Sequence, residues 1–101
     1  DLIHPNVQVY SYNPVVKGKK NILHCYVDGF HPPEIKITFQ KNGVLIEKVE
    51  TTELTFRLDW TFELLAYIPI VPDGKSNYSC IVVHSSITAP KNVTWGECFA
   101  P

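Results

Sequence analysis

The chain has 101 residues, of which 45% are hydrophobic, and a formal net charge of -1 at pH 7. This length suits one domain, and the near-neutral charge argues against a protein that binds nucleic acid or an anionic membrane surface. The sequence contains no low-complexity stretch, no charge block and no apolar run long enough to span a membrane. We therefore predict a single folded domain over residues 1–101.

The first half of the chain alternates apolar and polar residues in short runs, which is typical of β-strands buried on one face. Around Cys25, for example, Leu23 and Val27 occupy alternate positions with the cysteine, so these three side chains should point inward. Asn13-Pro14 ends the first run, and Asn42-Gly43 is a strong hairpin signal. The predicted strands in this half are 7–12, 21–28, 35–40 and 44–49.

The second half continues with a short strand and a long one, which the exposed tip Leu58-Asp59-Trp60 separates. Pro72-Asp73-Gly74 predicts a turn, because each of these residue types favours turn backbone. The predicted strands here are 55–56, 61–70, 78–84 and 91–95. Short strands at regular spacing, with turn signals between them, predict an all-β sandwich of two antiparallel sheets.

Cys25 and Cys80 lie in matching alternating runs, so each should point inward from its own strand. A bond between them would join the two sheets and close a loop of roughly 55 residues, worth about 4 kcal/mol in the chain-entropy model. Tyr78 stands two residues before Cys80, at the position of the tyrosine corner of such sandwiches. The alternative is two buried free thiols. Cys98 is left over, and the sequence does not decide between an exposed free thiol and a bond to another chain.

The two sheets should differ in their outward-facing residues. On the third strand the outward-facing residues are Lys36, Thr38 and Gln40, which form an ordinary solvated face. The sheet of Cys25 sends out four tyrosines and a leucine among its polar residues. The full set is Gln8, Tyr10, Tyr12, His24, Tyr26, Glu63, Leu65 and Tyr67. Tyrosine is enriched at protein interfaces, so this face predicts a protein partner, with Trp60 as a candidate hot spot. The alternative is that these aromatic residues are only good strand formers.

No pattern of reactive residues predicts an enzyme, a metal site or a cofactor. The five glycines lie far apart, so they cannot build a loop that holds phosphate. Ser85 and Ser86 directly follow His84, without the spacing of a nucleophile and its base. The histidines lie in separate segments without metal-ligand spacing. They are His4, His24, His31 and His84.

Two triplets match the N-glycosylation acceptor pattern, Asn77-Tyr78-Ser79 and Asn92-Val93-Thr94. Such triplets also arise by chance, and they are compatible with secretion. The chain begins at Asp1 without a charged and then apolar leader. We expect a secreted, extracellular product from which a leader has already been removed.

Tyr78, Cys80, Val82 and His84 follow one another at every second position. This signature resembles the constant-type immunoglobulin domains of antibodies, T-cell receptors and histocompatibility proteins. Within that set, the chain is similar along essentially its whole length to the light-subunit family of class I histocompatibility molecules. The matching segments are Gln8-Val9-Tyr10-Ser11, Cys25-Tyr26-Val27, Gly29-Phe30-His31-Pro32, Lys41-Asn42-Gly43, Ile46-Glu47-Lys48-Val49-Glu50, Asp59-Trp60, Phe62, Leu64-Leu65 and Trp95.

The resemblance implies a constant-type immunoglobulin sandwich with a cis peptide bond between His31 and Pro32. It implies a non-enzymatic subunit that pairs noncovalently with a class I heavy chain, supports its peptide-binding platform and reaches the cell surface through this partner. General constant domains place a tryptophan against the disulfide where this chain has Phe39. The light subunit also lacks that tryptophan, which favours the narrower match. The implied partner-binding residues are Gln8, Tyr10, Tyr12, Tyr26, His31, Glu53, Phe56, Trp60, Phe62 and Leu65.

Some residues depart from the family pattern. Leu58 and Glu63 lack the charge and aromatic character expected of their positions, and Cys98 and the tail 96–101 also depart. One alternative function is a constant domain of an antigen receptor or heavy chain, for which Cys98 would predict a disulfide-linked partner. A further alternative is a metal-dependent or hydrolytic enzyme. The sequence offers no combination of an acid, a base and a nucleophile from which such an active site could be assembled.

Overall fold

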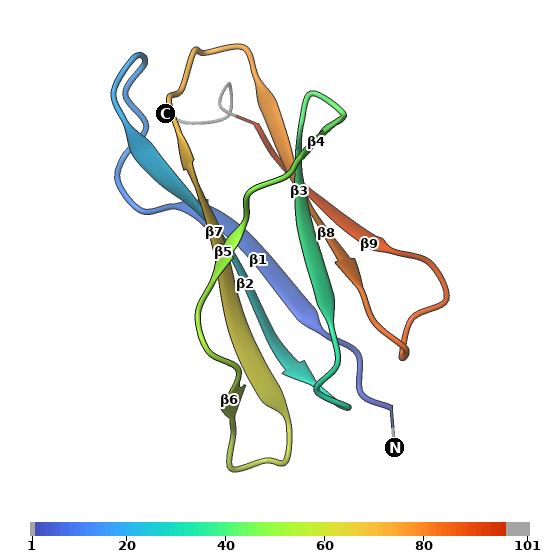
Figure 1. Cartoon of the computed structure of the whole chain (residues 1–101). Coiled ribbons are helices and arrows are strands. Elements are labelled where there is room, and N and C mark those ends of the chain that lie inside the picture. The colour runs from blue at the N-terminus through green and yellow to red at the C-terminus, as the bar shows by residue number, and fades with distance from the viewer. Residues whose placement is uncertain (1, 97–101) are drawn as a thin grey trace.

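The computed structural model of the chain describes residues 2–96 and shows two β-sheets facing each other (Figure 1). Within these residues the chain forms nine strands and no helix, and hence no helix that could cross a membrane. The strands are β1 (Asn6–Ser11), β2 (Asn21–Phe30), β3 (Lys36–Lys41), β4 (Val44–Ile46), β5 (Glu50–Thr51), β6 (Thr55–Phe56), β7 (Phe62–Ile70), β8 (Asn77–Val83) and β9 (Lys91–Gly96). The predicted all-β sandwich is confirmed.

Each sheet combines strands from both halves of the chain. The first sheet has the order β1-β2-β7-β5, with β6 also paired to β7, and the second has the order β4-β3-β8-β9. All of these pairs are antiparallel. Because β2 pairs with β7, and β3 with β8, the chain crosses repeatedly between the sheets, as in immunoglobulin-type sandwiches.

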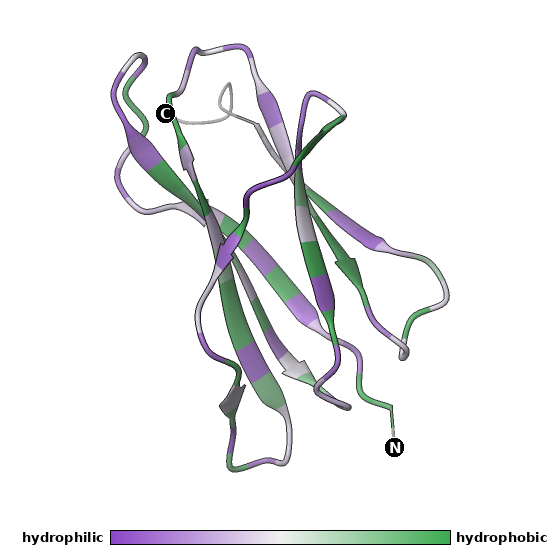
Figure 2. Cartoon of the chain, in the orientation of Figure 1, coloured by the Kyte–Doolittle hydropathy of each residue, from purple (hydrophilic) through white to green (hydrophobic). Residues whose placement is uncertain are grey.

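The core lies between the sheets and is built from alternate residues of the longest strands. On β2, Leu23, Cys25 and Val27 have no exposed surface. Figure 2 shows the alternation as green and purple bands along the strands. The sulfur atoms of Cys25 and Cys80 are bonded at 2.02 Å, and Phe39 lies directly opposite Cys80 on β3, fully buried. The predicted disulfide between the two sheets is confirmed.

Two predicted backbone features are also confirmed. Asn42 and Gly43 both have positive φ, of 52° and 83°, and they link β3 to β4 as a two-residue hairpin turn. Positive φ at both central residues is the requirement of a type I′ turn, which Asn-Gly satisfies best. The peptide bond between His31 and Pro32 is cis, as the resemblance implied.

The predicted fourth strand is wrong in its length. β4 ends at Ile46 instead of Val49, because the chain stops pairing with β3 there and crosses to the other sheet. Glu50–Thr51 then forms β5, which the sequence did not predict, and pairs with β7. Val49 packs against the core at this crossing. The other predicted strands differ from the observed ones by at most two residues at an end.

Asp73 organises the turn between β7 and β8. Its carboxylate accepts hydrogen bonds from the Ser76 hydroxyl and from the backbone N–H groups of Lys75 and Ser76. These hydrogen bonds, with that of the Ser76 hydroxyl as the largest contribution, lower the pKa of Asp73 to about 2, from an ordinary 3.8. Since the pKa is lower in the folded state, the ionised carboxylate stabilises the fold above about pH 4, and this contribution is lost as the pH falls through about 2.

Asp73→Asn is therefore expected to lower the melting temperature at pH 7, since the amide lacks the charge that strengthens these hydrogen bonds. The difference from the unmodified chain should shrink as the pH falls from about 4 to about 2. Thermal unfolding followed by circular dichroism over this pH range measures it, with Glu34→Gln, at an exposed residue, as control. A difference that stays constant over the range would contradict this role of Asp73.

Candidate functional site

The candidate site starts from the outward side of β1, β2 and β7, which we call the aromatic face. It consists of Gln8, Tyr10, Tyr12, His24, Tyr26, Glu63, Leu65 and Tyr67. The registers place Gln8, Tyr26 and Leu65 in one row across the three strands, and Tyr10, His24 and Tyr67 in the next. Neighbouring rows on one face of a sheet bring such side chains into contact. The set predicted from alternation therefore forms one continuous surface.

His24 is the centre of an aromatic cluster at one end of this face. The centroid of its ring lies 5.2 Å from that of Tyr10, 5.7 Å from that of Tyr12 and 6.2 Å from that of Tyr67. Partial burial of the imidazole lowers the pKa of His24, so this side chain is mainly neutral at pH 7. Tyr10 and Tyr12 are exposed, and an uncharged cluster of this kind offers apolar contact area together with hydroxyl groups.

A second aromatic cluster, the tip cluster, lies at the opposite end of the sheet, where β6 pairs with β7 (Figure 1). It consists of His31, Phe56, Trp60 and Phe62. The Phe62 ring lies 5.1 Å from Phe56 and 6.0 Å from His31, on which it stacks. Phe56 contacts Trp60 edge-on at 5.7 Å. Phe62 also lies 6.4 Å from the buried ring of Phe30, so the exposed aromatic residues of the tip are connected to the core.

Trp60 projects from an ordered turn. Its side chain is 74% exposed, beside a fully exposed Leu58, and its φ of 70° lies in the left-handed region that few non-glycine residues adopt. The backbone N–H of Arg57 donates to the carbonyl of Thr61 at 2.7 Å, and that of Trp60 donates to the carbonyl of Arg57 at 3.1 Å. The Asp59 carboxylate accepts hydrogen bonds from the N–H and hydroxyl of Thr61. A partner would meet a turn whose backbone is already ordered, which lowers the entropic cost of binding.

Polar residues occupy the middle of the surface, between the two clusters. The Tyr26 hydroxyl donates a hydrogen bond to Glu63, and this bond, with burial as a smaller cause, raises the pKa of Tyr26 to about 12. A nitrogen of Arg57 lies 2.8 Å from an Asp28 oxygen, and its second terminal nitrogen lies 3.9 Å from an Asp59 oxygen. We call Tyr26, Asp28, Arg57 and Glu63 the polar centre.

The implied partner-binding residues all lie on the aromatic face, in the tip cluster or beside them, and none is fully buried. Six are exposed, namely Gln8, Tyr10, Tyr12, Glu53, Phe56 and Trp60, and four are half-buried, namely Tyr26, His31, Phe62 and Leu65. Glu53 stands at the margin, between β5 and β6. The predicted residues thus lie on the aromatic face or at the β6 end of the same sheet, where Phe62 also packs against the core.

Sequence reasoning missed the ion pair of Asp28 with Arg57 and the hydrogen bond of Tyr26 with Glu63. Asp28 lies directly opposite Glu63 in the register of β2 and β7. Two like charges in such a pair destabilise a sheet unless a cation or a donor relieves them. The repulsion between Asp28 and Glu63 therefore predicts both contacts, but it can be recognised only once the register of β2 with β7 is known.

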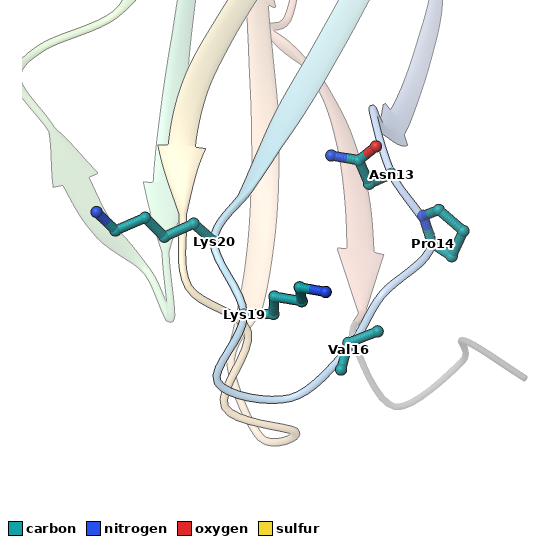
Figure 3. Close-up of a pocket in the computed structure, with 5 residues that line it drawn as sticks. All are labelled: Asn13, Pro14, Val16, Lys19 and Lys20. Atoms are coloured by element: carbon teal, nitrogen blue, oxygen red, sulfur yellow. The ribbon is translucent and has the colours of Figure 1, made fainter.

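The hollow at the loop that connects β1 to β2 is a separate surface feature (Figure 3). It is lined by Asn13, Pro14, Val16, Lys19 and Lys20. Figure 3 shows the two lysine side chains pointing in different directions. A ligand site needs a few polar groups that converge on one point, so we assign no ligand to this hollow.

His84 and its serine neighbours have a structural role. The imidazole is buried, with Nε2 2.8 Å from the carbonyl oxygen of Pro32 and Nδ1 2.6 Å from the hydroxyl of Ser86. The contact with Pro32 joins the loop after β2 to the loop after β8, and the contact with Ser86 lies within the loop after β8. Within residues 2–96, no three histidine, cysteine or acidic side chains approach closely enough to hold a metal ion.

Three further features of the sequence lie outside the aromatic face and the tip cluster, or outside the described residues. Asn77 and Asn92 are both exposed, and the attachment of sugars to them stays a prediction. Cys98, and with it residues 97–101 of the departing tail, falls outside the described residues.

Comparison with known proteins gives a consistent relationship. Residues 7–87 match the family model of the immunoglobulin C1-set domain. The beta-2-microglobulin of Oryctolagus cuniculus is 52% identical over 91 residues, which cover 90% of this chain and 92% of that protein. The beta-2-microglobulin of Callimico goeldii is 50% identical over 92% of this chain and 78% of that protein. The beta-2-microglobulin of Cavia porcellus is 47% identical over 90% of this chain and 92% of that protein. The chain therefore belongs to the beta-2-microglobulin family of immunoglobulin C1-set domains.

Proposed function

We propose that this chain is the non-enzymatic light subunit of a class I histocompatibility molecule. It pairs noncovalently with the heavy chain and stabilises its peptide-binding platform for antigen presentation. Membership of the beta-2-microglobulin family supports this function. The structural observation that carries it is the 74% exposure of Trp60 on an ordered turn beside the aromatic face. A large aromatic side chain held in water at the edge of an aromatic surface is typical of a binding hot spot.

The proposed contact surface joins the aromatic face, the polar centre and the tip cluster. Its partner-binding residues are Gln8, Tyr10, Tyr12, Tyr26, His31, Glu53, Phe56, Trp60, Phe62 and Leu65. Phe56 and Trp60 are the anchors, because they are exposed and in mutual contact. Glu53 is a rim residue, and an exposed rim charge contributes little to affinity.

We further propose that the chain acts outside the cell and is held at the cell surface through the heavy chain, in a ternary complex with bound peptide. The disulfide between Cys25 and Cys80 supports this location, because such bonds persist in oxidising compartments and are rare in the cytosol.

Refolding of the chain with the ectodomain of a class I heavy chain from the same organism, in the presence of peptide, tests this function. We expect a stable complex with one copy of each component, by size-exclusion chromatography and mass spectrometry. When this chain is omitted, we expect no stable complex of the heavy chain with peptide. Non-reducing electrophoresis should separate the two chains. A disulfide-linked partner would favour the constant domain of an antigen receptor or heavy chain. Failure with every heavy chain of that organism would contradict the proposal.

A further inference from the structure

Glu63 carries a negative charge in the middle of the proposed contact surface. In the strand registers it lies between Asp28 of β2 and Thr55 of β6, and the residue is half-buried. The Tyr26 hydroxyl donates a hydrogen bond to its Oε2 atom. Because Tyr26 is itself half-buried within the sheet face, this bond fixes the position of the carboxylate.

The charge of Glu63 has no counter-ion within residues 2–96. Arg57 is engaged elsewhere, 2.8 Å from Asp28 and 3.9 Å from Asp59, and no basic side chain of the described residues forms an ion pair with Glu63. Two carboxylates, those of Asp28 and Asp59, already share this guanidinium, and Glu63 is a third acidic residue directly opposite Asp28. Three acidic residues beside one cation leave two negative charges unbalanced. Tyr26 does not change this balance, because its phenol, with a pKa of about 12, stays neutral.

Covering this carboxylate with a partner changes its energetics. In the free chain, water solvates the side of Glu63 that faces outward. A partner that excludes this water without supplying a positive charge would leave a buried and unpaired carboxylate, which is strongly unfavourable. A partner that supplies an arginine or lysine would instead form a charge-assisted hydrogen bond. The same residue thus favours one class of partner surface and opposes the others.

We propose that Glu63 is a specificity-determining residue, which selects heavy chains that place an arginine or lysine opposite its carboxylate. This inference rests on the proposed function and names the chemistry of the partner at one point of the contact surface. Tyr26 acts as a positioning residue, since its hydrogen bond holds the carboxylate in place.

Equilibrium binding of the chain to an immobilised class I heavy chain with peptide tests this inference. Glu63→Gln removes the charge and keeps the shape, and we expect affinity to fall on the order of tenfold. Glu63→Lys should weaken binding further, because it places like charges together. Raising the salt concentration from about 0.05 to about 0.5 M should weaken the wild-type complex and have a smaller effect on Glu63→Gln, since salt screens the charge pair.

Two control variants separate the charge from its position. Glu47→Gln removes the same charge at an exposed residue beside β4 in the other sheet, and we expect affinity within about twofold of wild type. Tyr26→Phe keeps the ring and the charge of Glu63 but removes the hydrogen bond. We expect it to lower affinity while the salt dependence of the wild type is retained. Thermal unfolding of each isolated variant establishes that it is folded.

Any result of these binding experiments other than the expected ones contradicts the inference. Unchanged affinity of Glu63→Gln, together with weakened binding of Trp60→Ala, would overturn it and leave the proposed function intact. A wild-type affinity that does not depend on salt would overturn it without any variant. If the wild-type chain bound no heavy chain of its organism, the proposed function and this inference would both be wrong.

Discussion

Replacing Cys25 and Cys80 together by alanine is expected to lower the melting temperature of the isolated domain by roughly 15 to 30 °C. The two residues are separated by 55 positions, and closing a loop of that length contributes about 4 kcal/mol in the chain-entropy model. In a domain of this size, each kcal/mol changes the melting temperature by roughly 4 to 8 °C. Both side chains are fully buried, so removing their sulfur atoms also leaves space in the core.

Thermal unfolding by circular dichroism measures this effect, with and without a reducing agent. The matched control is the double change Val44→Ala with Leu45→Ala, which truncates two exposed side chains of β4. Since surface changes of this kind usually have small effects on stability, the control should melt close to the wild type. Identical melting curves for the oxidised and fully reduced wild-type chain would show that the disulfide contributes no stability.

Trp60→Ala is expected to weaken assembly with a class I heavy chain by about 2 kcal/mol or more, which is roughly thirtyfold in affinity. The indole is 74% exposed in the free chain, so a partner pocket would remove a large apolar area from water. The turn that presents Trp60 is held by backbone hydrogen bonds and by Asp59, which the substitution does not remove. The stability of the isolated domain should therefore change little.

Binding to immobilised heavy chain, together with the melting temperature of the free variant, measures both effects. Lys36→Ala is the control, because Lys36 is exposed on β3 of the other sheet. It should alter neither assembly nor stability. Loss of assembly in Lys36→Ala and normal assembly in Trp60→Ala would place the interface on the other sheet, and the aromatic face would then reflect strand propensity alone.

The core of this fold could be predicted because burial on one side of a strand imposes a period of two. Leu23, Cys25 and Val27 follow that period, and all three are fully buried. The same period assigns the intervening residues to the outward side, so the residues of the aromatic face could be named before the registers were known. The hairpin at Asn42-Gly43 was predictable for a different reason, since few other residue pairs adopt positive φ twice in succession.

What could not be predicted depends on contacts between distant segments. The chain leaves β3 after Ile46 and forms β5 at Glu50–Thr51, and neither event has a periodic signal within so few residues. The polar centre is similar, since the hydrogen bond of Tyr26 with Glu63 joins residues 37 positions apart. Such contacts follow from the register of β2 with β7, which alternation alone does not determine.

Hydroxyl-radical footprinting of the free chain and of its complex with heavy chain and peptide tests the location of the interface most directly. It reports the solvent exposure of side chains without any substitution. We expect oxidation of Tyr10, Phe56 and Trp60 to fall on assembly, since all three are exposed in the free chain and lie in the proposed contact surface. Oxidation of Leu45, which is exposed on β4 of the other sheet, should stay unchanged. Protection of Leu45 with unchanged oxidation of Trp60 would contradict the assignment of the aromatic face and the tip cluster to the heavy chain.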